Sequence, residues 1–154
     1  MRRLVVGLSL VLLAAGCSSE PAQLSGFVRD PLPDVSVASL PDVSSDGVDL
    51  SMRAPEGEIL LLYFGYTSCP DVCPTTLADL RTALRQIGDT ATRVNVAMAT
   101  IDPERDTDEV ITGYVQSFIP GAHALRTDSP DELRAAANVF GADYGVSELS
   151  LIHI

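Results

Sequence analysis

Hydrophobic residues along this chain follow two different periods. Residues 58–67 and 93–102 are nearly continuous apolar runs, a pattern typical of strands that are covered on both faces of a sheet. Residues 123–127 predict a further, shorter strand. After each of these segments, apolar residues recur every three or four positions, which predicts an amphipathic helix. Strands and helices therefore alternate along most of the chain.

Three helices are predicted, from about residue 75 to 87, in residues 106–118 and in residues 129–141. Gly88 is a natural stop for the first helix, and Asp106 or Thr107 is the expected cap of the second. The apolar residues expected to face the sheet are Leu77, Leu80, Leu84 and Ile87 in the first helix, Val110, Tyr114 and Phe118 in the second, and Leu133, Ala136, Ala137 and Phe140 in the third.

An early β-hairpin is predicted at residues 44–53, with its turn at Asp46-Gly47. A hairpin followed by the order β-α-β-α-β-α implies a mixed sheet with helices on both faces. The cysteines lie where the first central strand passes into the first helix, which is the thioredoxin-like arrangement. Two more strands usually follow in that fold, but the sequence ends at Ile154. The expected fold is therefore α/β and thioredoxin-like, in one domain at residues 30–154 that lacks the last strands and leaves a sheet edge uncovered.

The first residues have the composition of an export signal. Two arginines precede an apolar run at residues 4–15, which is too short to cross a bilayer comfortably. The small residues before Cys17 resemble a bacterial lipobox, so residues 1–17 are interpreted as a lipoprotein signal peptide with Cys17 as the lipidation site. An ordinary secretory signal with an incidental cysteine is the alternative. Residues 18–29 are then a tether, and the protein is expected on the extracytoplasmic face of a bacterial cell membrane.

The net charge narrows the range of partners. A formal charge of −11 leaves no basic face for phosphates, so nucleic acid is not an expected partner. An acidic protein is also repelled by anionic lipid, so its link to the membrane should be covalent. Export has a further consequence, because outside the cytoplasm a nearby cysteine pair is able to form a disulfide.

Cys69 and Cys73 are separated by three residues, at the start of the first predicted helix. Backbone N–H groups at a helix start have no helical partners and stabilise a thiolate. A thiol at this position is therefore expected to have a pKa below its free value of about 8.5. Such a thiolate serves as a nucleophile or as a metal ligand, and two thiolates prefer soft ions such as Cu(I), or Zn(II). The spacing alone leaves a redox pair, a metal site and a structural disulfide open.

Two segments carry a family resemblance. Residues 64–80, FGYTSCPDVCPTTLADL, resemble the cysteine signature of the Sco/SenC copper-binding proteins, and residues 99–107, ATIDPERDT, resemble their second signature. The resemblance implies a membrane-anchored, thioredoxin-like protein that binds copper, Cu(I) or Cu(II), through Cys69, Cys73 and one downstream histidine. Proteins of this family assist assembly of the dinuclear copper centre of cytochrome c oxidase. The copper-binding subunit of that oxidase is therefore the expected partner.

The histidine departs from the family pattern. The family ligand lies well beyond the third helix, in a segment such as Val-Asp-His-Ser, whereas His153 stands second from the end of this sequence. Either His153 is the ligand of a shortened variant, or the tail from Ser147 comes from a truncation or frameshift and the ligand is missing. The second explanation is favoured, because metal-bound imidazole normally relies on a partner at its other nitrogen. His123 is expected to be an exposed loop residue.

The second signature also contains charged residues with expected roles. Asp102 is expected at the end of the neighbouring strand, close to the site. Two roles are open for it: a structural turn with Pro103, or a hydrogen-bond acceptor behind the metal ligands. The turn is favoured. Arg105 and Asp106 are expected to pair locally and to cap the second helix.

Copper delivery is the leading hypothesis for the function, with the ion passing from Cys69 and Cys73 to the oxidase by ligand exchange. The alternative is an extracytoplasmic thiol–disulfide reductase, in which one sulfur is the nucleophile and the other the resolving thiol. A structural lipoprotein with an inert disulfide is the third possibility. The three-residue spacing favours copper over the reductase.

Overall fold

The computed structural model describes residues 26, 28–146 and 151–153. The predicted signal peptide, Cys17 and most of the predicted tether lie outside the described residues. The helices are α1 (Val72–Gln86), α2 (Asp108–Phe118) and α3 (Pro130–Phe140), and short 3-10 helices cover Val35–Val37 and Gly88–Arg93. The strands are β1 (Ser39–Asp42), β2 (Val48–Ser51), β3 (Ile59–Gly65), β4 (Val94–Thr100), β5 (His123–Leu125), β6 (Tyr144–Val146) and β7 (Leu151–His153). None of the described helices is long and apolar enough to span a membrane.

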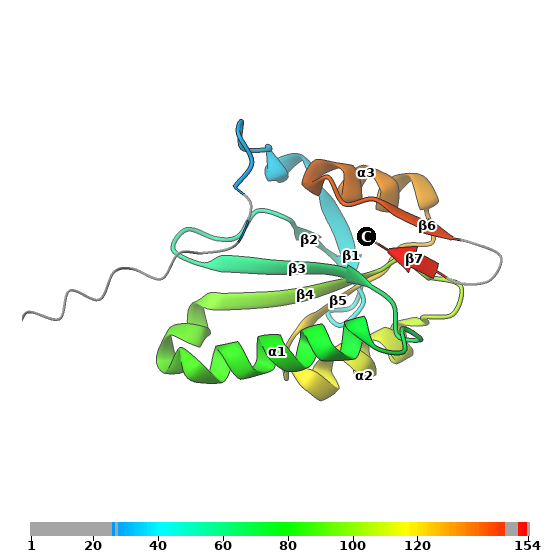
Figure 1. Cartoon of the computed structure of the whole chain (residues 1–154). Coiled ribbons are helices and arrows are strands. Elements are labelled where there is room, and N and C mark those ends of the chain that lie inside the picture. The colour runs from blue at the N-terminus through cyan, green and yellow to red at the C-terminus, as the bar shows by residue number, and fades with distance from the viewer. Residues whose placement is uncertain (1–25, 27, 147–150, 154) are drawn as a thin grey trace, which may run out of the picture.

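Five strands form a mixed sheet in the order β2-β1-β5-β4-β3. Strands β3, β4 and β5 are parallel, and β1 is antiparallel to both β2 and β5. Helices α1 and α2 lie on one face of the sheet and α3 lies on the other (Figure 1). The predicted hairpin is formed by β1 and β2, with Asp46 and Gly47 at positive φ (55° and 74°) in its turn. The mixed sheet and its two helical layers confirm the expected thioredoxin-like architecture.

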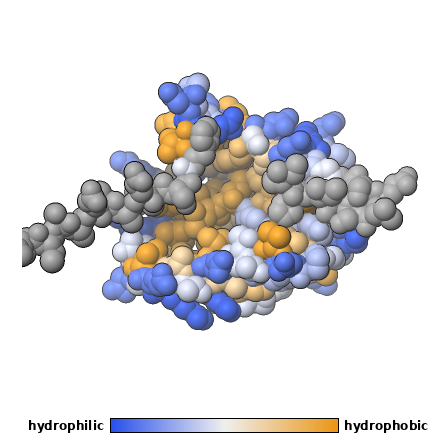
Figure 2. Space-filling model, viewed as in Figure 1, coloured by the Kyte–Doolittle hydropathy of each residue, from blue (hydrophilic) through white to orange (hydrophobic). Residues whose placement is uncertain are grey.

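The interior strands of the sheet are β1, β5 and β4, and β3 lies at one edge. Residues 96–100 of β4 are buried, whereas residues 60–64 of β3 are only half-buried. The prediction that this strand is central is therefore wrong, but its two faces are covered as predicted, with Leu60, Leu62 and Phe64 against one core cluster and Leu61 and Tyr63 against the other. Among the described strands β3 pairs with β4 alone, so its apolar residues lie at an open margin. Figure 2 shows hydrophobic residues gathered on this side of the molecule.

Helix α2 lies within the predicted segment, and Tyr114 and Phe118 of its predicted apolar stripe pack against the core, whereas Val110 does not. Thr107, one of the two predicted caps, is its N-cap and accepts from the N–H of Val110. Ile111 and Val115 are fully buried, whereas Val110 is 44% exposed. The predicted stripe advanced in steps of four residues, which drift by about 40° per step from a fixed direction on the helix. The predicted stripe therefore started at the exposed Val110 and missed the fully buried Ile111 and Val115.

The residues after α3 form strands that the sequence did not predict. Gly141 ends α3 with a left-handed conformation, at φ 63°, and the chain continues into β6. Strands β6 and β7 pair antiparallel in a separate two-stranded sheet. The guanidinium of Arg134, on α3, lies 3.8 Å from the ring centre of Tyr144 and donates to the Tyr144 carbonyl. The domain was expected to lack its last strands, and among the described residues the strands after α3 form this small sheet and do not extend the main one.

Candidate functional site

The cysteine loop, residues 66–71, joins the carboxyl end of β3 to α1. Helix α1 begins at Val72, three residues before its predicted start, so Cys73 lies in its first turn. Cys69 and Cys73 belong to a buried cluster with Tyr66 and Ile101, the residue that follows β4. The side chains packed against this cluster are Tyr63, Phe64 and Tyr144. The ends of β3 and β4 and the start of α1 thus position the two cysteines.

The two cysteines lie next to each other, and no disulfide joins them. The backbone N–H of Cys73 donates to Sγ of Cys69 over 3.3 Å, and the two thiols also hydrogen-bond with each other. Cys69 is 8% exposed and Cys73 is fully buried. The pair therefore meets solvent only at the Cys69 side.

The two thiols differ in acidity. Burial opposes ionisation of Cys69, but hydrogen bonds from the Cys73 thiol and from the N–H groups of Cys73 and Asp71 outweigh it and lower the pKa of Cys69. Burial and the neighbouring Cys69 raise the pKa of Cys73. The lowered pKa predicted for a thiol at the helix start is therefore found for Cys69 and not for Cys73. The reason is that the N–H of Cys73, in the first turn of the helix, points at the sulfur of Cys69.

Tyr63 is a site residue that the sequence did not reveal. Its hydroxyl donates a hydrogen bond to Sγ of Cys73 over 3.2 Å. Burial and this bond raise the pKa of Tyr63 above its ordinary value, so the hydroxyl stays protonated at neutral pH. The available signal was the two-residue period of a strand, which places Tyr63 and Gly65 on the same face just before the cysteine loop.

Asp106 also has a role different from the predicted one. It is fully buried and accepts three hydrogen bonds, from the N–H of Thr67 (3.0 Å), the hydroxyl of Thr67 (2.5 Å) and the hydroxyl of Thr100 (2.6 Å). The predicted pairing of Asp106 with Arg105 is therefore wrong, because the carboxylate points inward. Asp106 ties the cysteine loop to the end of β4, a contact between residues 39 positions apart.

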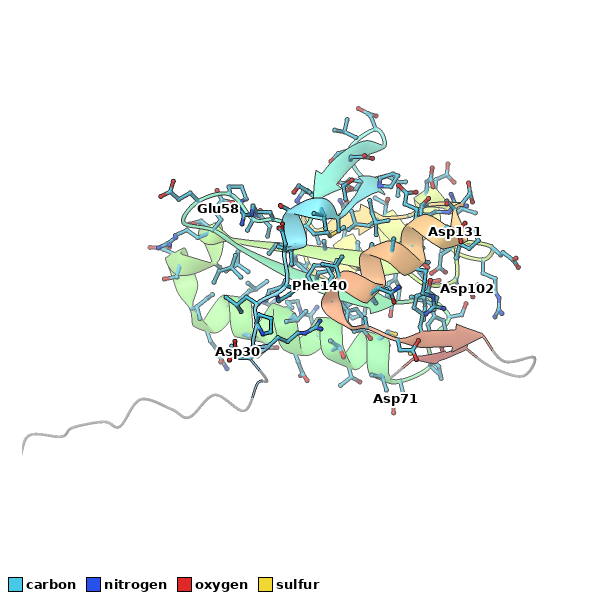
Figure 3. The ribbon with its side chains drawn as sticks, turned by 90° about the horizontal axis from the view of Figure 1, so that it is seen from above. Asp30, Glu58, Asp71, Asp102, Asp131 and Phe140 are labelled. Atoms are coloured by element: carbon cyan, nitrogen blue, oxygen red, sulfur yellow. The ribbon has the colours of Figure 1, made fainter. Side chains whose placement is uncertain are left out.

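Asp102 follows β4 directly, as predicted, and is nearly buried. Burial raises the pKa of its carboxyl, and the Arg105 guanidinium at 3.1 Å partly offsets this. Its carbonyl accepts from the N–H groups of Arg105 and Asp106 at 3.2 and 3.0 Å, which fits the predicted turn role. Asp102 also lines an open cavity of about 430 Å³ together with Tyr144 and the first turns of α3. Figure 3 shows it beside that helix, near Asp131.

The two histidines lie in different parts of the structure. His123 is the first residue of β5, and its Nδ1 lies 2.6 Å from Oδ2 of the buried Asp42. The prediction of an exposed loop residue is therefore wrong, because this carboxylate draws the imidazole against the sheet. His153 lies in β7 opposite Tyr144, and its side chain is outside the described part of the structure. Among the described side chains, no group of three or more histidines, cysteines and carboxylates is arranged to hold a metal ion.

Comparisons with known proteins give a consistent result. A model of the SCO1/SenC family matches residues 41–150. The SCO2-like protein of Rickettsia typhi is 31% identical over 118 residues, which cover 76% of this chain and 57% of that protein. The copper-bound ScoI structures of Bradyrhizobium japonicum and Arabidopsis thaliana are both 32% identical, with TM-scores of 0.62 and 0.65. The match to the Bradyrhizobium structure covers 76% of this chain and 76% of that one. The match to the Arabidopsis structure covers 75% of this chain and 73% of that one.

The match includes the parts of the chain that build the site. Residues 41–150 contain both cysteines, Tyr63 and the whole second signature. The chain spans 57%, 32% and 42% of the lengths of three curated relatives that it matches. The family model nevertheless covers most of the chain, and this protein therefore belongs to the SCO1/SenC family.

Proposed function

We propose that this protein carries copper on Cys69 and Cys73 and delivers it during assembly of the dinuclear copper centre of cytochrome c oxidase. The observation that carries the proposal is the adjacency of the two thiols, with the Cys73 N–H donating to Sγ of Cys69 over 3.3 Å. Thiolates are soft ligands and suit Cu(I). The copper-bound ScoI structures, which share this fold at 32% identity, support the same assignment.

Copper is the cargo in this proposal, and the chain supplies the ligands and a protected environment. Both thiols lose their protons when the ion binds, and the lowered pKa of Cys69 makes it the first to do so. The buried Tyr66, Ile101 and Cys73 exclude water from the inner side of the pair. Access for the ion, and for the ligands of a recipient protein, is at the Cys69 side.

His153 remains a proposed third ligand. Its pairing opposite Tyr144, a residue packed against the sulfur cluster, supports the assignment. In the alternative, the family histidine is missing and the two thiolates hold Cu(I) alone. A His153→Ala variant distinguishes these cases. It loses Cu(II) and keeps Cu(I) if the imidazole is a ligand, and it binds both ions as the original protein does if the imidazole is not.

The membrane anchor is proposed from the sequence alone. Acylation of Cys17 after removal of the signal peptide would hold the protein on the extracytoplasmic face of the membrane, beside the membrane-bound oxidase. Palmitate labelling of the protein in a bacterial host tests this directly. Label should be incorporated into the original protein and absent from Cys17→Ala.

A thiol–disulfide reductase is the second candidate function. The unequal acidities of the pair favour it, because a nucleophilic thiol needs a lowered pKa and a resolving thiol does not. The two functions are separated by one comparison on the reduced protein. Retention of about one Cu(I) per chain against a competing chelator, lost in Cys69→Ser, supports copper delivery. Absence of retention, combined with turnover of a disulfide substrate, supports the reductase.

A further inference from the structure

Cys69 and Cys73 share the hydrogen bond between them and a partner in Tyr66, but Cys73 has a further partner in the sheet. The hydroxyl that bonds Cys73 belongs to Tyr63 in β3, so it is fixed to the sheet. The groups that hydrogen-bond Cys69 are Tyr66, Asp71 and Cys73, which lie in its own loop or at the start of α1. Cys73 is also fully buried, whereas Cys69 retains some exposure. Both sulfurs therefore lie in one buried cluster, but the hydrogen bond from the sheet is made to Cys73, and Cys69 is the one that retains exposure.

A glycine makes the contact between Tyr63 and Cys73 possible. A Cβ placed on Gly65 would lie 2.6 Å from Cε1 of Tyr63 and 3.3 Å from Sγ of Cys73. The first distance is shorter than carbon atoms tolerate, so any side chain here would displace the tyrosine ring. The hydroxyl of Tyr63 is further bonded by Thr76 on α1. Ring and hydroxyl are thus fixed from two sides, with the sulfur of Cys73 between the strand and the helix.

We propose that Tyr63 is a positioning residue that anchors Cys73, so that Cys73 holds copper throughout transfer and Cys69 is the ligand exchanged first. This inference rests on the proposed copper delivery. In the exchange, a recipient ligand forms a bond to Cu(I) as the bond from copper to Sγ of Cys69 breaks. The copper stays Cu(I), and the released Cys69 thiolate takes a proton from solvent. The bond to Cys73 breaks afterwards.

The direct test is Tyr63→Phe, which keeps the ring and removes only the hydroxyl. Tyr114→Phe is the matched control, because Tyr114 is also half-buried and its hydroxyl has no hydrogen-bond partner among the described residues. Outer partners of metal ligands typically contribute 10–100-fold to metal affinity. We expect Tyr63→Phe to hold Cu(I) about 10–100-fold more weakly against bathocuproine disulfonate, and Tyr114→Phe to match the original protein.

A second measurement uses the protein without copper. Limited alkylation of the reduced chain with iodoacetamide, mapped by mass spectrometry, should label Cys69 first in the original protein. Labelling of Cys73 should rise about tenfold relative to Cys69 in Tyr63→Phe, because a lost hydrogen bond to a charged or buried group has an effect of this size. Gly65→Ala should change the labelling in the same direction, since its Cβ displaces the ring.

The outcomes distinguish this inference from the proposed function. If the original protein retains no Cu(I), copper delivery fails, and the alkylation ratio still decides whether Tyr63 anchors Cys73. If Tyr63→Phe keeps both the copper retention and the alkylation ratio of the original protein within twofold, the anchoring role is overturned. If only the alkylation ratio changes, Tyr63 positions the sulfur, but the unequal roles of the two ligands are refuted.

Discussion

The carboxylate of Asp106 binds Thr67 at both its backbone N–H (3.0 Å) and its hydroxyl (2.5 Å). Thr67 lies in the cysteine loop, two residues before Cys69, and Asp106 lies between β4 and α2. The same carboxylate accepts from Thr100 at the end of β4. The loop that carries Cys69 is therefore held in place from the second signature segment, through a single buried charge.

We expect Asp106→Asn to lower the free energy of unfolding by about 2–4 kcal/mol, because an amide replaces an acceptor of three buried hydrogen bonds and introduces unmatched donors. Urea denaturation at neutral pH measures the change. Asp79→Asn, an exposed carboxylate on α1, is the control and should stay within about 0.5 kcal/mol of the original protein. Equal stability of the two variants would contradict the anchoring role of Asp106.

Helix α2 provides a test of the buried face. Ile111→Ala should lower the free energy of unfolding by about 2–5 kcal/mol, because it leaves a cavity beneath the helix, whereas Val110→Ala should have a much smaller effect, because Val110 is already 44% exposed. The comparison uses the same helix and the same replacement residue. Urea denaturation measures both effects. If Val110→Ala destabilised the protein more than Ile111→Ala, Val110 would belong to the buried face, as the sequence predicted.

The pair of Asp42 and His123 predicts an acid-dependent loss of stability. Burial alone would raise the pKa of Asp42, but hydrogen bonds from Ser44, His123 and Ser45 outweigh it and lower this pKa below its ordinary value. A lowered pKa contributes stability above the unfolded value of about 3.9, and this contribution disappears as pH falls through the folded value. Asp42→Asn should therefore be less stable at pH 7 and should lose less stability between pH 5 and pH 3.

Denaturation curves for both proteins at pH 7, 5, 4 and 3 measure this difference. Asp79→Asn serves again as the control and should follow the original protein at each pH. Parallel loss of stability in Asp42→Asn and the original protein would show that Asp42 does not contribute to the acid sensitivity.

The unequal acidity of the two thiols predicts two different pH profiles for alkylation. The rate for Cys69 should reach half its maximum at a lower pH than for an ordinary thiol, and the rate for Cys73 should do so at a higher pH. Mass spectrometry after short iodoacetamide pulses follows the two residues in one sample. In denaturant the two profiles should coincide, since burial and the helix N–H groups are then lost. A folded protein with Cys73 as the more acidic thiol would overturn the assignment.

Much of the fold could be predicted because it depends on local patterns. The turn at Asp46-Gly47 and the cap at Thr107 are set by residues close in sequence, and both are confirmed. The positions of β3 at the edge and β4 in the interior of the sheet could not be predicted in this way. An apolar run shows that a strand is largely covered, but its neighbours are set by strands elsewhere in the chain.

In the candidate site, too, the features set by local sequence could be predicted and those set by distant residues could not. The cysteine spacing and the strand-to-helix transition predicted where Cys69 and Cys73 lie. The partners of the site were missed because they depend on long-range packing. Asp106 reaches Thr67 across 39 positions, and Tyr63 reaches Cys73 only because Gly65 has no side chain.

The most direct test of copper binding by the two cysteines is X-ray absorption at the copper edge on the reduced protein loaded with one equivalent of Cu(I). The account predicts two sulfur ligands per copper in the original protein, and loss of stable loading in both Cys69→Ser and Cys73→Ser. A copper site without sulfur ligands, or unchanged loading in either serine variant, would contradict it.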